Sequence, residues 1–137
     1  MVGQKIDGIE VSNAVKDILK SAVEKLKSEG VEPCLATVLV GDDPASATYV
    51  KNKHNACEKI GIKTKDHKLP VETTQKHLDE IVSKLNQDKE VHGILVQLPL
   101  PNHLDEFVTV SRISPIKDVD GLTPQNVGLL SMGKSIL

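Results

Sequence analysis

Apolar residues recur along this chain with two different periods, and the two periods alternate. Residues 11–30 place their apolar side chains on one helical stripe, with Gly30 as the expected stop. Residues 34–41, CLATVLVG, form a short and nearly continuous apolar run that ends in glycine. Such a run is typical of a strand buried on both faces. The helical stripe is made up of Val11, Val15, Ile18, Leu19, Ala22, Val23 and Leu26.

The same alternation continues after the first strand. A second helix is expected to begin just after Asp42 or Asp43, because either side chain can cap it and Pro44 fits its first turn. Gly61 is expected to close this helix. Residues 62–70 are less apolar and predict a weaker strand that is followed by proline.

The second half of the chain repeats the order of helix and strand. Residues 73–88 predict a third helix, and residues 91–101, VHGILVQLPLP, predict a second buried strand. This strand should stop near Gln97 or Leu98, because Pro99 and Pro101 cannot lie in a central ladder. Short helices are expected over residues 104–110 and after Thr123, a cap residue followed by proline. The inward positions of the third helix are Leu78, Ile81, Val82 and Leu85.

Alternating strands and helices predict an α/β fold, a three-layer αβα sandwich around a mainly parallel sheet. A length of 137 residues fits one domain better than two. The last seven residues, 131–137, are largely apolar and carry no stop signal, so we expect the chain to be a fragment of a longer protein.

Composition argues against several classes of protein, among them nucleic-acid-binding and membrane proteins. The chain has one tyrosine and one phenylalanine, a net charge of −2 and no run of basic residues, which argues against nucleic-acid binding. No apolar run is long enough to cross a membrane, and the N-terminus lacks a signal-peptide core, so a cytoplasmic protein is expected. The two cysteines fit neither a disulfide framework nor a zinc site, and the five histidines show no ligand pairing. We therefore predict no metal site.

Candidate chemistry lies where ligands bind in such sheets, beyond the carboxyl ends of the strands. Tyr49 and Lys53, four residues apart, share one face of the second helix. They either line a pocket, where the lysine acts as a base, or lie on an ordinary surface helix. Gln97 either holds a ligand or a lysine at the end of its strand, or marks the point where that strand meets solvent.

The loop SPIKDVDG, residues 114–121, is a third candidate. Asp118 and Asp120 either accept paired hydrogen bonds from an amidine-like edge of a ligand or cap a turn before Gly121. The loop lacks the distant glutamate of a calcium site. The chain contains no G-x-G-x-x-G phosphate cradle, so it shows no dinucleotide site of its own.

Three segments together resemble a known family. The stretches VGDDPASATYVKNKHNACEKIGI, VHGILVQLPLP and PIKDVDGLTPQNVGLL closely resemble the folate-binding, catalytic domain of the bifunctional methylenetetrahydrofolate dehydrogenase/methenyltetrahydrofolate cyclohydrolase family. The resemblance covers most of the chain, from about Val11 onward, and residues 1–137 are assigned to this one domain.

The resemblance implies a role for each motif residue. It makes Lys53 the catalytic proton-transfer group, Tyr49 the ring that packs on folate, and Gln97 the residue that supports and tunes the lysine. It places Asp120 on the edge of the pterin. It implies further substrate contacts for a motif serine and for two residues of the pocket wall, which are Ser46, Leu98 and Pro99.

The implied activity is the interconversion of methylene-, methenyl- and formyl-tetrahydrofolate, in one-carbon metabolism and purine biosynthesis. Family members carry a second, Rossmann-type domain that binds NADP or NAD, and the resemblance implies that this domain is absent from the present chain. The dehydrogenase step would need it, and no cofactor is expected on this chain alone. The family forms homodimers mainly through that domain, so a monomer is expected here.

Three interpretations follow. The chain is the folate-site domain of such an enzyme, or a folate-binding half without catalysis, or a flavodoxin-like regulatory domain whose acidic loops bind a metal ion. Dependence of ligand binding on magnesium would favour the third. An effect of Lys53 on turnover separates the first from the second.

Overall fold

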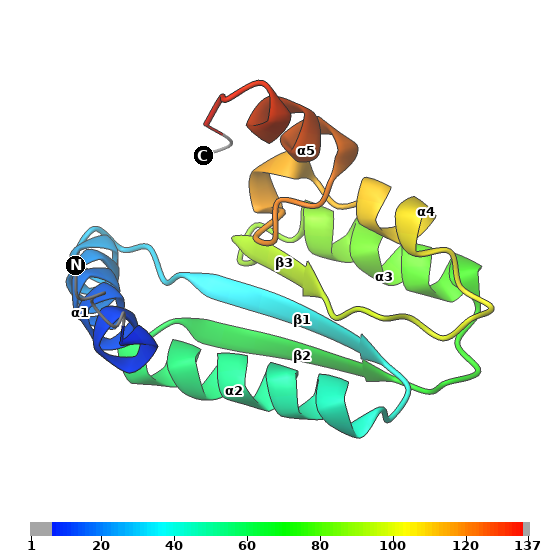
Figure 1. The fold of residues 1–137 in the computed structure, drawn as a ribbon, viewed down its shortest axis with the longest axis horizontal. Helices are drawn as coiled ribbons and strands as arrows, with labels where there is room; N and C mark the ends of the chain where they lie inside the picture. Colours follow the sequence, from blue (N-terminus) through cyan, green and yellow to red (C-terminus); the bar gives the residue numbers. More distant parts are fainter. Residues whose placement is uncertain (1–6, 136–137) are drawn as a thin grey trace, which may run out of the picture.

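The computed structural model describes residues 7–135 as three parallel strands and their connecting helices. Figure 1 shows the elements in the alternating order that the sequence predicts. Among the described residues no helix is long and apolar enough to cross a membrane. The elements are α1 (Gly8–Ser28), β1 (Cys34–Val40), α2 (Pro44–Ile60), β2 (Lys63–Leu69), α3 (Gln75–Gln87), β3 (Gly93–Val96), α4 (Glu106–Ser111), the 3-10 turn η1 (Pro115–Lys117) and α5 (Pro124–Ser131).

The sheet has the order β2-β1-β3, and all pairs are parallel. The two faces of β1 are covered by different helices, with α2 and α3 on opposite sides of the sheet (Figure 1). Val38 on β1 packs in a cluster with Leu78 of α3, whereas its neighbour Thr37 hydrogen-bonds with His54 of α2. Successive residues of a strand point to opposite faces, so this alternation confirms the predicted three-layer αβα sandwich.

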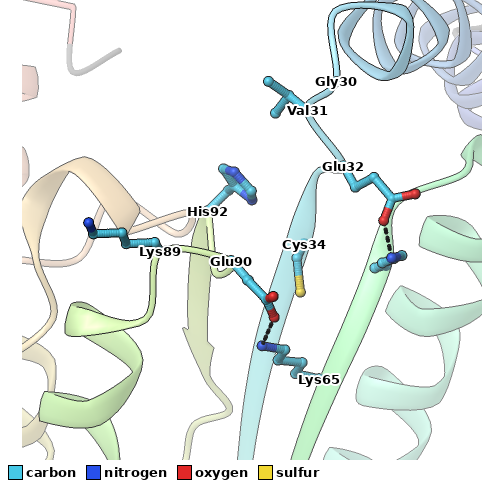
Figure 2. A pocket seen from close by; sticks show the side chains of 9 residues that line it. Gly30, Val31, Glu32, Cys34, Lys65, Lys89, Glu90 and His92 are labelled. Carbon is cyan, nitrogen blue, oxygen red and sulfur yellow. Dashed lines mark hydrogen bonds and ion pairs between the residues drawn. The ribbon is translucent and has the colours of Figure 1, made fainter.

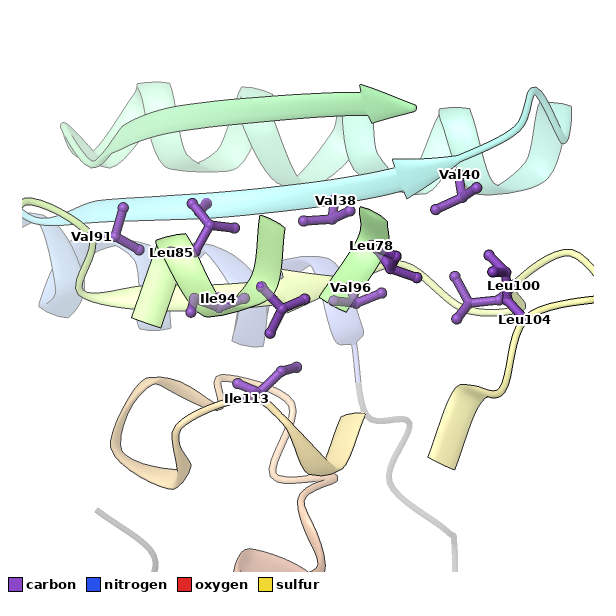
Figure 3. Close-up of a cluster of buried hydrophobic side chains, with 12 residues drawn as sticks. Val38, Val40, Leu78, Leu85, Val91, Ile94, Val96, Leu100, Leu104 and Ile113 are labelled. Carbon is purple, nitrogen blue, oxygen red and sulfur yellow. The ribbon is translucent and has the colours of Figure 1, made fainter. Parts of the chain in front are cut away.

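The main core lies between α3 and the sheet (Figure 3). Leu78 and Val82 of α3 are fully buried and Leu85 nearly so, as the helical period predicts, and Ile81 packs against the same cluster. The core is aliphatic, because neither Tyr49 nor any other aromatic residue belongs to it. Both cysteines are buried and free.

Local capping explains where α2 begins and ends. The carboxylate of Asp43 accepts a hydrogen bond from Ser46 N at 2.7 Å, and Pro44 lies in the first turn. Gly61 ends the helix in the left-handed conformation, with φ of 85°. A residue with a side chain is strained in that conformation, so glycine is the residue suited to this end. Of the two predicted caps, Asp43 is the one used.

The stripe predicted on α1 exists, but most of it is not buried. Of its members, Val23 is 5% exposed, whereas Ile18 is 71% exposed. The reason is the position of α1, which packs against the end of α2 and not along the sheet (Figure 1). Val23 lies at this contact, beside Gly61.

Candidate active site

The Lys53 and Gln97 side chains meet, although 44 positions separate them in the sequence. We call them the lysine–glutamine pair. Lys53 Nζ donates to Gln97 Oε1 at 3.3 Å. Gln97 follows the last residue of β3, and its own N–H donates to Val38 O at 2.9 Å. The pair therefore joins the middle of α2 to the carboxyl end of β3, where ligands bind in parallel sheets.

The amide of Gln97 has a defined orientation. Gln97 Nε2 donates to Leu98 O at 2.7 Å, which leaves Oε1 as the atom that faces Lys53. Lys53 is half-buried and forms no ion pair with any residue in the described range 7–135. A neutral acceptor thus holds the amine in place without a carboxylate to neutralise it.

Tyr49 and Ser46 lie on the same helix as Lys53. Tyr49 precedes Lys53 by one helical turn and is 62% exposed, so its ring is available to a flat ligand. Ser46 is buried at the start of α2 and hydrogen-bonds with Asp43. This hydrogen bonding lowers the pKa of the Asp43 carboxyl group. Among the described residues, no hydrogen bond joins Ser46 to the lysine–glutamine pair.

Leu98 and Pro99 continue directly from Gln97. The peptide bond between them is cis. Leu98 packs against the main core, whereas Pro99 is exposed. The turn is fixed from the other side by Glu106, whose Oε1 accepts a hydrogen bond from Leu100 N at 2.8 Å. These contacts hold the backbone just after Gln97 in a single path.

The two aspartates of the KDVDG loop have different surroundings. Asp118 is buried, and its carboxylate accepts hydrogen bonds from Leu122 N, Thr123 N and Asn126 Nδ2 at 3.2, 2.8 and 2.9 Å. Burial alone raises the pKa of Asp118, but the hydrogen bonds from Thr123, Asn126 and Leu122 together outweigh it and lower the pKa. The turn-capping interpretation is therefore confirmed for Asp118.

Asp120 is exposed and forms no hydrogen bond or ion pair with any residue that the structure describes. Asp118 forms a parallel bridge with Ile94, the second residue of β3, so this part of the loop lies along the edge of the sheet. The helix pattern before the loop contained no signal for this pairing.

Sequence reasoning gave His54 no role, but the structure connects it to the sheet. His54 Nε2 lies 2.7 Å from Asp66 Oδ1 and 3.1 Å from Thr37 Oγ1. Thr37 Oγ1 also donates to Asp66 Oδ1 at 2.9 Å. These contacts fix α2 to β1 and β2 one residue away from Lys53. Thr37 is a hydroxyl inside an otherwise apolar strand, and a buried hydroxyl needs a hydrogen-bond partner, so this residue could have indicated the contact.

A separate cavity of about 370 Å³ lies at the amino ends of the strands (Figure 2). Lys63 pairs with Glu32, and Lys65 Nζ lies 2.9 Å from Asp88 Oδ2 and 3.0 Å from Glu90 Oε2. The hydrogen bonds to Asp88 and Glu90 raise the pKa of Lys65 well above its usual value. We call this the amino-end cavity; its lining is Gly30, Val31, Glu32, Cys34, Lys63, Lys65, Lys89, Glu90 and His92.

No cluster of three or more histidine, cysteine, aspartate or glutamate side chains within residues 7–135 is arranged to hold a metal ion. Asp118, the first aspartate of the DVD sequence, instead uses its oxygens to bind N–H donors. The described residues therefore give no support to the metal-binding regulatory interpretation.

Comparison with known families agrees with this geometry. Residues 6–120 match the catalytic domain of the tetrahydrofolate dehydrogenase/cyclohydrolase family. The match spans both halves of the lysine–glutamine pair and both aspartates of the KDVDG loop. The chain belongs to this family.

Relatives within the family are similar over nearly the whole chain. The bifunctional protein FolD of Nitrosopumilus maritimus is 68% identical over 137 residues, which are 100% of this chain and 48% of that protein. The FolD protein of Cenarchaeum symbiosum is 58% identical over 96% of this chain and 47% of its own length. The chain thus spans about half the length of these relatives.

Solved structures of the family have the same fold. The bifunctional FolD methylenetetrahydrofolate dehydrogenase/cyclohydrolase of Campylobacter jejuni superposes with a TM-score of 0.92 at 49% identity, over 94% of this chain and 46% of that one. The Trypanosoma brucei enzyme, solved with NADP cofactor and inhibitor, superposes with a TM-score of 0.89 at 38% identity, over 93% of this chain and 44% of that one.

The family's use of a nicotinamide cofactor raises the question of whether the residues described here fit one. The N-terminus of α2 follows β1 directly, as in many phosphate sites. However, the Asp43 carboxylate already binds Ser46 N there, and Asp42 adds a second negative charge. This helix start does not fit a pyrophosphate, and we derive no step through a dinucleotide.

Proposed function

We propose that this chain is the folate-site domain of a methylenetetrahydrofolate dehydrogenase/methenyltetrahydrofolate cyclohydrolase, and that residues 1–137 form one catalytic domain. The observation that carries the proposal is the 3.3 Å contact between Lys53 Nζ and Gln97 Oε1 in a chain of this family. A half-buried amine beside a neutral acceptor, next to an exposed tyrosine, suits proton transfer to a flat, uncharged or cationic substrate.

The reaction that these residues support is hydrolysis of methenyl-tetrahydrofolate. Water adds to the methenyl carbon, and Lys53 takes a proton from that water as the C–O bond forms. One C–N bond then breaks as Lys53 returns the proton to the departing nitrogen. The hydroxyl group of the adduct loses its remaining proton to solvent, which gives the formyl product. The overall reaction consumes one water and releases one proton, and the lysine ends each cycle in its starting protonation state.

The other residues bind and orient. Gln97 keeps the amine of Lys53 directed at the reacting carbon, and Tyr49 stacks on the folate ring. The Asp120 carboxylate accepts paired hydrogen bonds from the pterin edge. Substrate contacts are proposed also for the buried serine of α2 and for the turn after Gln97, that is, Ser46, Leu98 and Pro99.

The dehydrogenase half of the activity is proposed for the whole protein and not for these residues alone. The relatives are about twice as long as this chain, and one solved relative holds NADP. We propose that NADP or NAD is bound mainly by residues of a nucleotide-binding domain outside this chain. The chain is proposed to act in the cytoplasm as a monomer, in one-carbon metabolism and purine biosynthesis.

A second candidate function, folate binding without catalysis, is favoured by one observation. Tyr49 is 62% exposed, so the second wall of a cleft is not supplied by the residues near it. The test is the decay of methenyl-tetrahydrofolate absorbance with the purified chain, corrected for the uncatalysed rate. Acceleration supports the enzyme. No acceleration by a chain that is folded and binds 5-formyltetrahydrofolate supports the binding half.

A further inference from the structure

Hydrogen bonds to Asp118 link the KDVDG loop to the residues that follow it. Its carboxylate is 3% exposed and binds the N–H groups of Leu122 and Thr123 and the side-chain amide of Asn126. All three donors come from the chain after Asp120. The loop is therefore closed around one buried anion, and the hydrogen-bonding capacity of that anion is taken up inside the protein.

The residues just before Asp120 are fixed to the body of the domain. Lys117 Nζ donates to three backbone carbonyls at the end of α3, at distances of 3.1, 2.9 and 2.8 Å. Asp118 pairs with Ile94 of β3. Val119 lies so close to the sheet that a Cβ at Gly93 would be 2.6 Å from its Cγ1 atom. Glycine at position 93 thus lets the loop approach β3.

Asp120 lies between these two sets of anchors and has no hydrogen-bond or ion-pair partner among residues 7–135. Gly121, which follows it, has φ of 67°, a conformation that glycine adopts without strain. The loop therefore has a fixed backbone on both sides of one exposed carboxylate.

We infer that Asp118 is a positioning residue for Asp120: it holds the loop so that the Asp120 carboxylate faces two adjacent N–H donors on a flat ligand edge. The inference rests on the proposed function, because the ligand edge is that of a pterin. A loop that is already ordered loses little further conformational entropy when the ligand binds. Loss of the Asp118 contacts would therefore weaken binding through Asp120. Asp118 itself touches no ligand.

The test is a double-mutant cycle on binding of 5-formyltetrahydrofolate, measured by calorimetry. The variants are Asp118→Asn, Asp120→Ala and the double variant. Asp120→Ala is expected to weaken binding about 10- to 100-fold, the usual range for a hydrogen bond to a charged group. Asp118→Asn is expected to weaken it about tenfold, and to add nothing in the Asp120→Ala background.

Asp105→Asn is the matched control. Asp105 caps α4 by accepting a hydrogen bond from Val108 N at 2.9 Å, so the variant also loses a loop carboxylate that binds a backbone N–H. It is expected to leave binding unchanged. If Asp118→Asn does not fold, Asn126→Ala replaces it, because Asn126 supplies one of the donors to Asp118. Its effect should likewise vanish in the Asp120→Ala background.

Three outcomes of the binding measurement overturn the inference. Additive losses in the double variant would mean that Asp118 acts independently of Asp120. Unchanged affinity in folded Asp118→Asn would mean that the loop needs no such support. Unchanged affinity in Asp120→Ala would remove the pterin contact of the proposed function as well, so this result is distinct from the other two. A lower kcat at unchanged KM for methenyl-tetrahydrofolate in Asp118→Asn also contradicts a role in positioning a binding group.

Discussion

The two ends of the sheet both carry lysines, but the lysines have different partners. At the amino ends, Lys65 lies between the carboxylates of Asp88 and Glu90. At the carboxyl end of β3, the Lys53 amine hydrogen-bonds only to the amide oxygen of Gln97 among the described residues. The amino-end lysine is held as a charged partner in ion pairs, whereas the other amine is positioned without being neutralised.

This difference distinguishes Lys65, which forms surface ion pairs, from Lys53, whose surroundings suit proton transfer. Ion pairs favour the ammonium form, which has no lone pair to accept a proton. Exposed pairs of this kind also add little to the stability of a protein. An amide acceptor fixes the direction of the amine and adds no negative charge that would favour the ammonium form.

The largest effect is expected from Lys53→Met. Removal of the proton-transfer group should lower the hydrolysis of methenyl-tetrahydrofolate about 10²- to 10⁴-fold, the usual contribution of general acid–base catalysis. Binding of 5-formyltetrahydrofolate should stay within a few fold, because the methionine keeps the length of the side chain. Lys51→Met, on the exposed side of the same helix, is the control for the lost charge. Hydrolysis that survives in Lys53→Met contradicts the assigned role.

Gln97→Glu converts the lysine–glutamine pair into an ion pair like those of Lys65. The new carboxylate would hold Lys53 in its charged form, so hydrolysis should fall about 10- to 100-fold while the protein stays folded. The same change at Gln87, at the end of α3, should have no effect on the rate. A Gln97→Glu rate equal to that of the unaltered chain would show that the neutral acceptor is unimportant.

Asp118→Asn should destabilise the fold by about 1–2 kcal/mol at pH 7, since a buried carboxylate loses part of its hydrogen bonding. Because hydrogen bonding lowers the pKa of Asp118 in the folded state, its stabilising effect is present above the unfolded pKa of about 4. The effect is lost as pH falls through the folded pKa, so the difference between variant and wild type should shrink in acid. Urea unfolding at pH 7 and below pH 4 measures it; a constant difference would contradict this origin.

The smallest effect is expected from Lys65→Met. The Lys65 ion pairs are solvent-accessible, with 37% of the lysine side chain exposed. Hydrolysis and folate binding should both stay within about twofold of wild type, because exposed ion pairs contribute little to stability. The amino-end cavity also lies at the other ends of the strands from the lysine–glutamine pair. A large loss of binding in this variant would assign the ligand to the amino-end cavity.

Much of the fold was predictable from the sequence, because its signals are local. Asp43, Pro44 and Gly61 mark the start and end of α2 by their own backbone preferences. The apolar period of residues 73–88 predicted the buried side of α3 around Leu78. The stripe on α1 was equally regular, yet its burial depends on where the helix packs, which no local pattern specifies.

The candidate site was predictable only in part, because its contacts are not local. The spacing of residues indicated Lys53 and Gln97 separately, and the family resemblance implied that they act together, but only the fold shows the 3.3 Å contact. Residue types alone left Asp118 and Asp120 equivalent, and the resemblance singled out Asp120. The structural difference between the two arises from donors five and eight positions after Asp118. His54 had no sequence signal of its own, since its partners are on two separate strands.

The most direct test of the central claim is a map of chemical-shift changes in the ¹⁵N-labelled chain as 5-formyltetrahydrofolate is added. A chain of 137 residues suits this measurement. The account predicts that the changes cluster on Tyr49, Lys53, Gln97 and Asp120. Changes that cluster on the lysines of the amino-end cavity, with Lys53 and Gln97 unmoved, would contradict it.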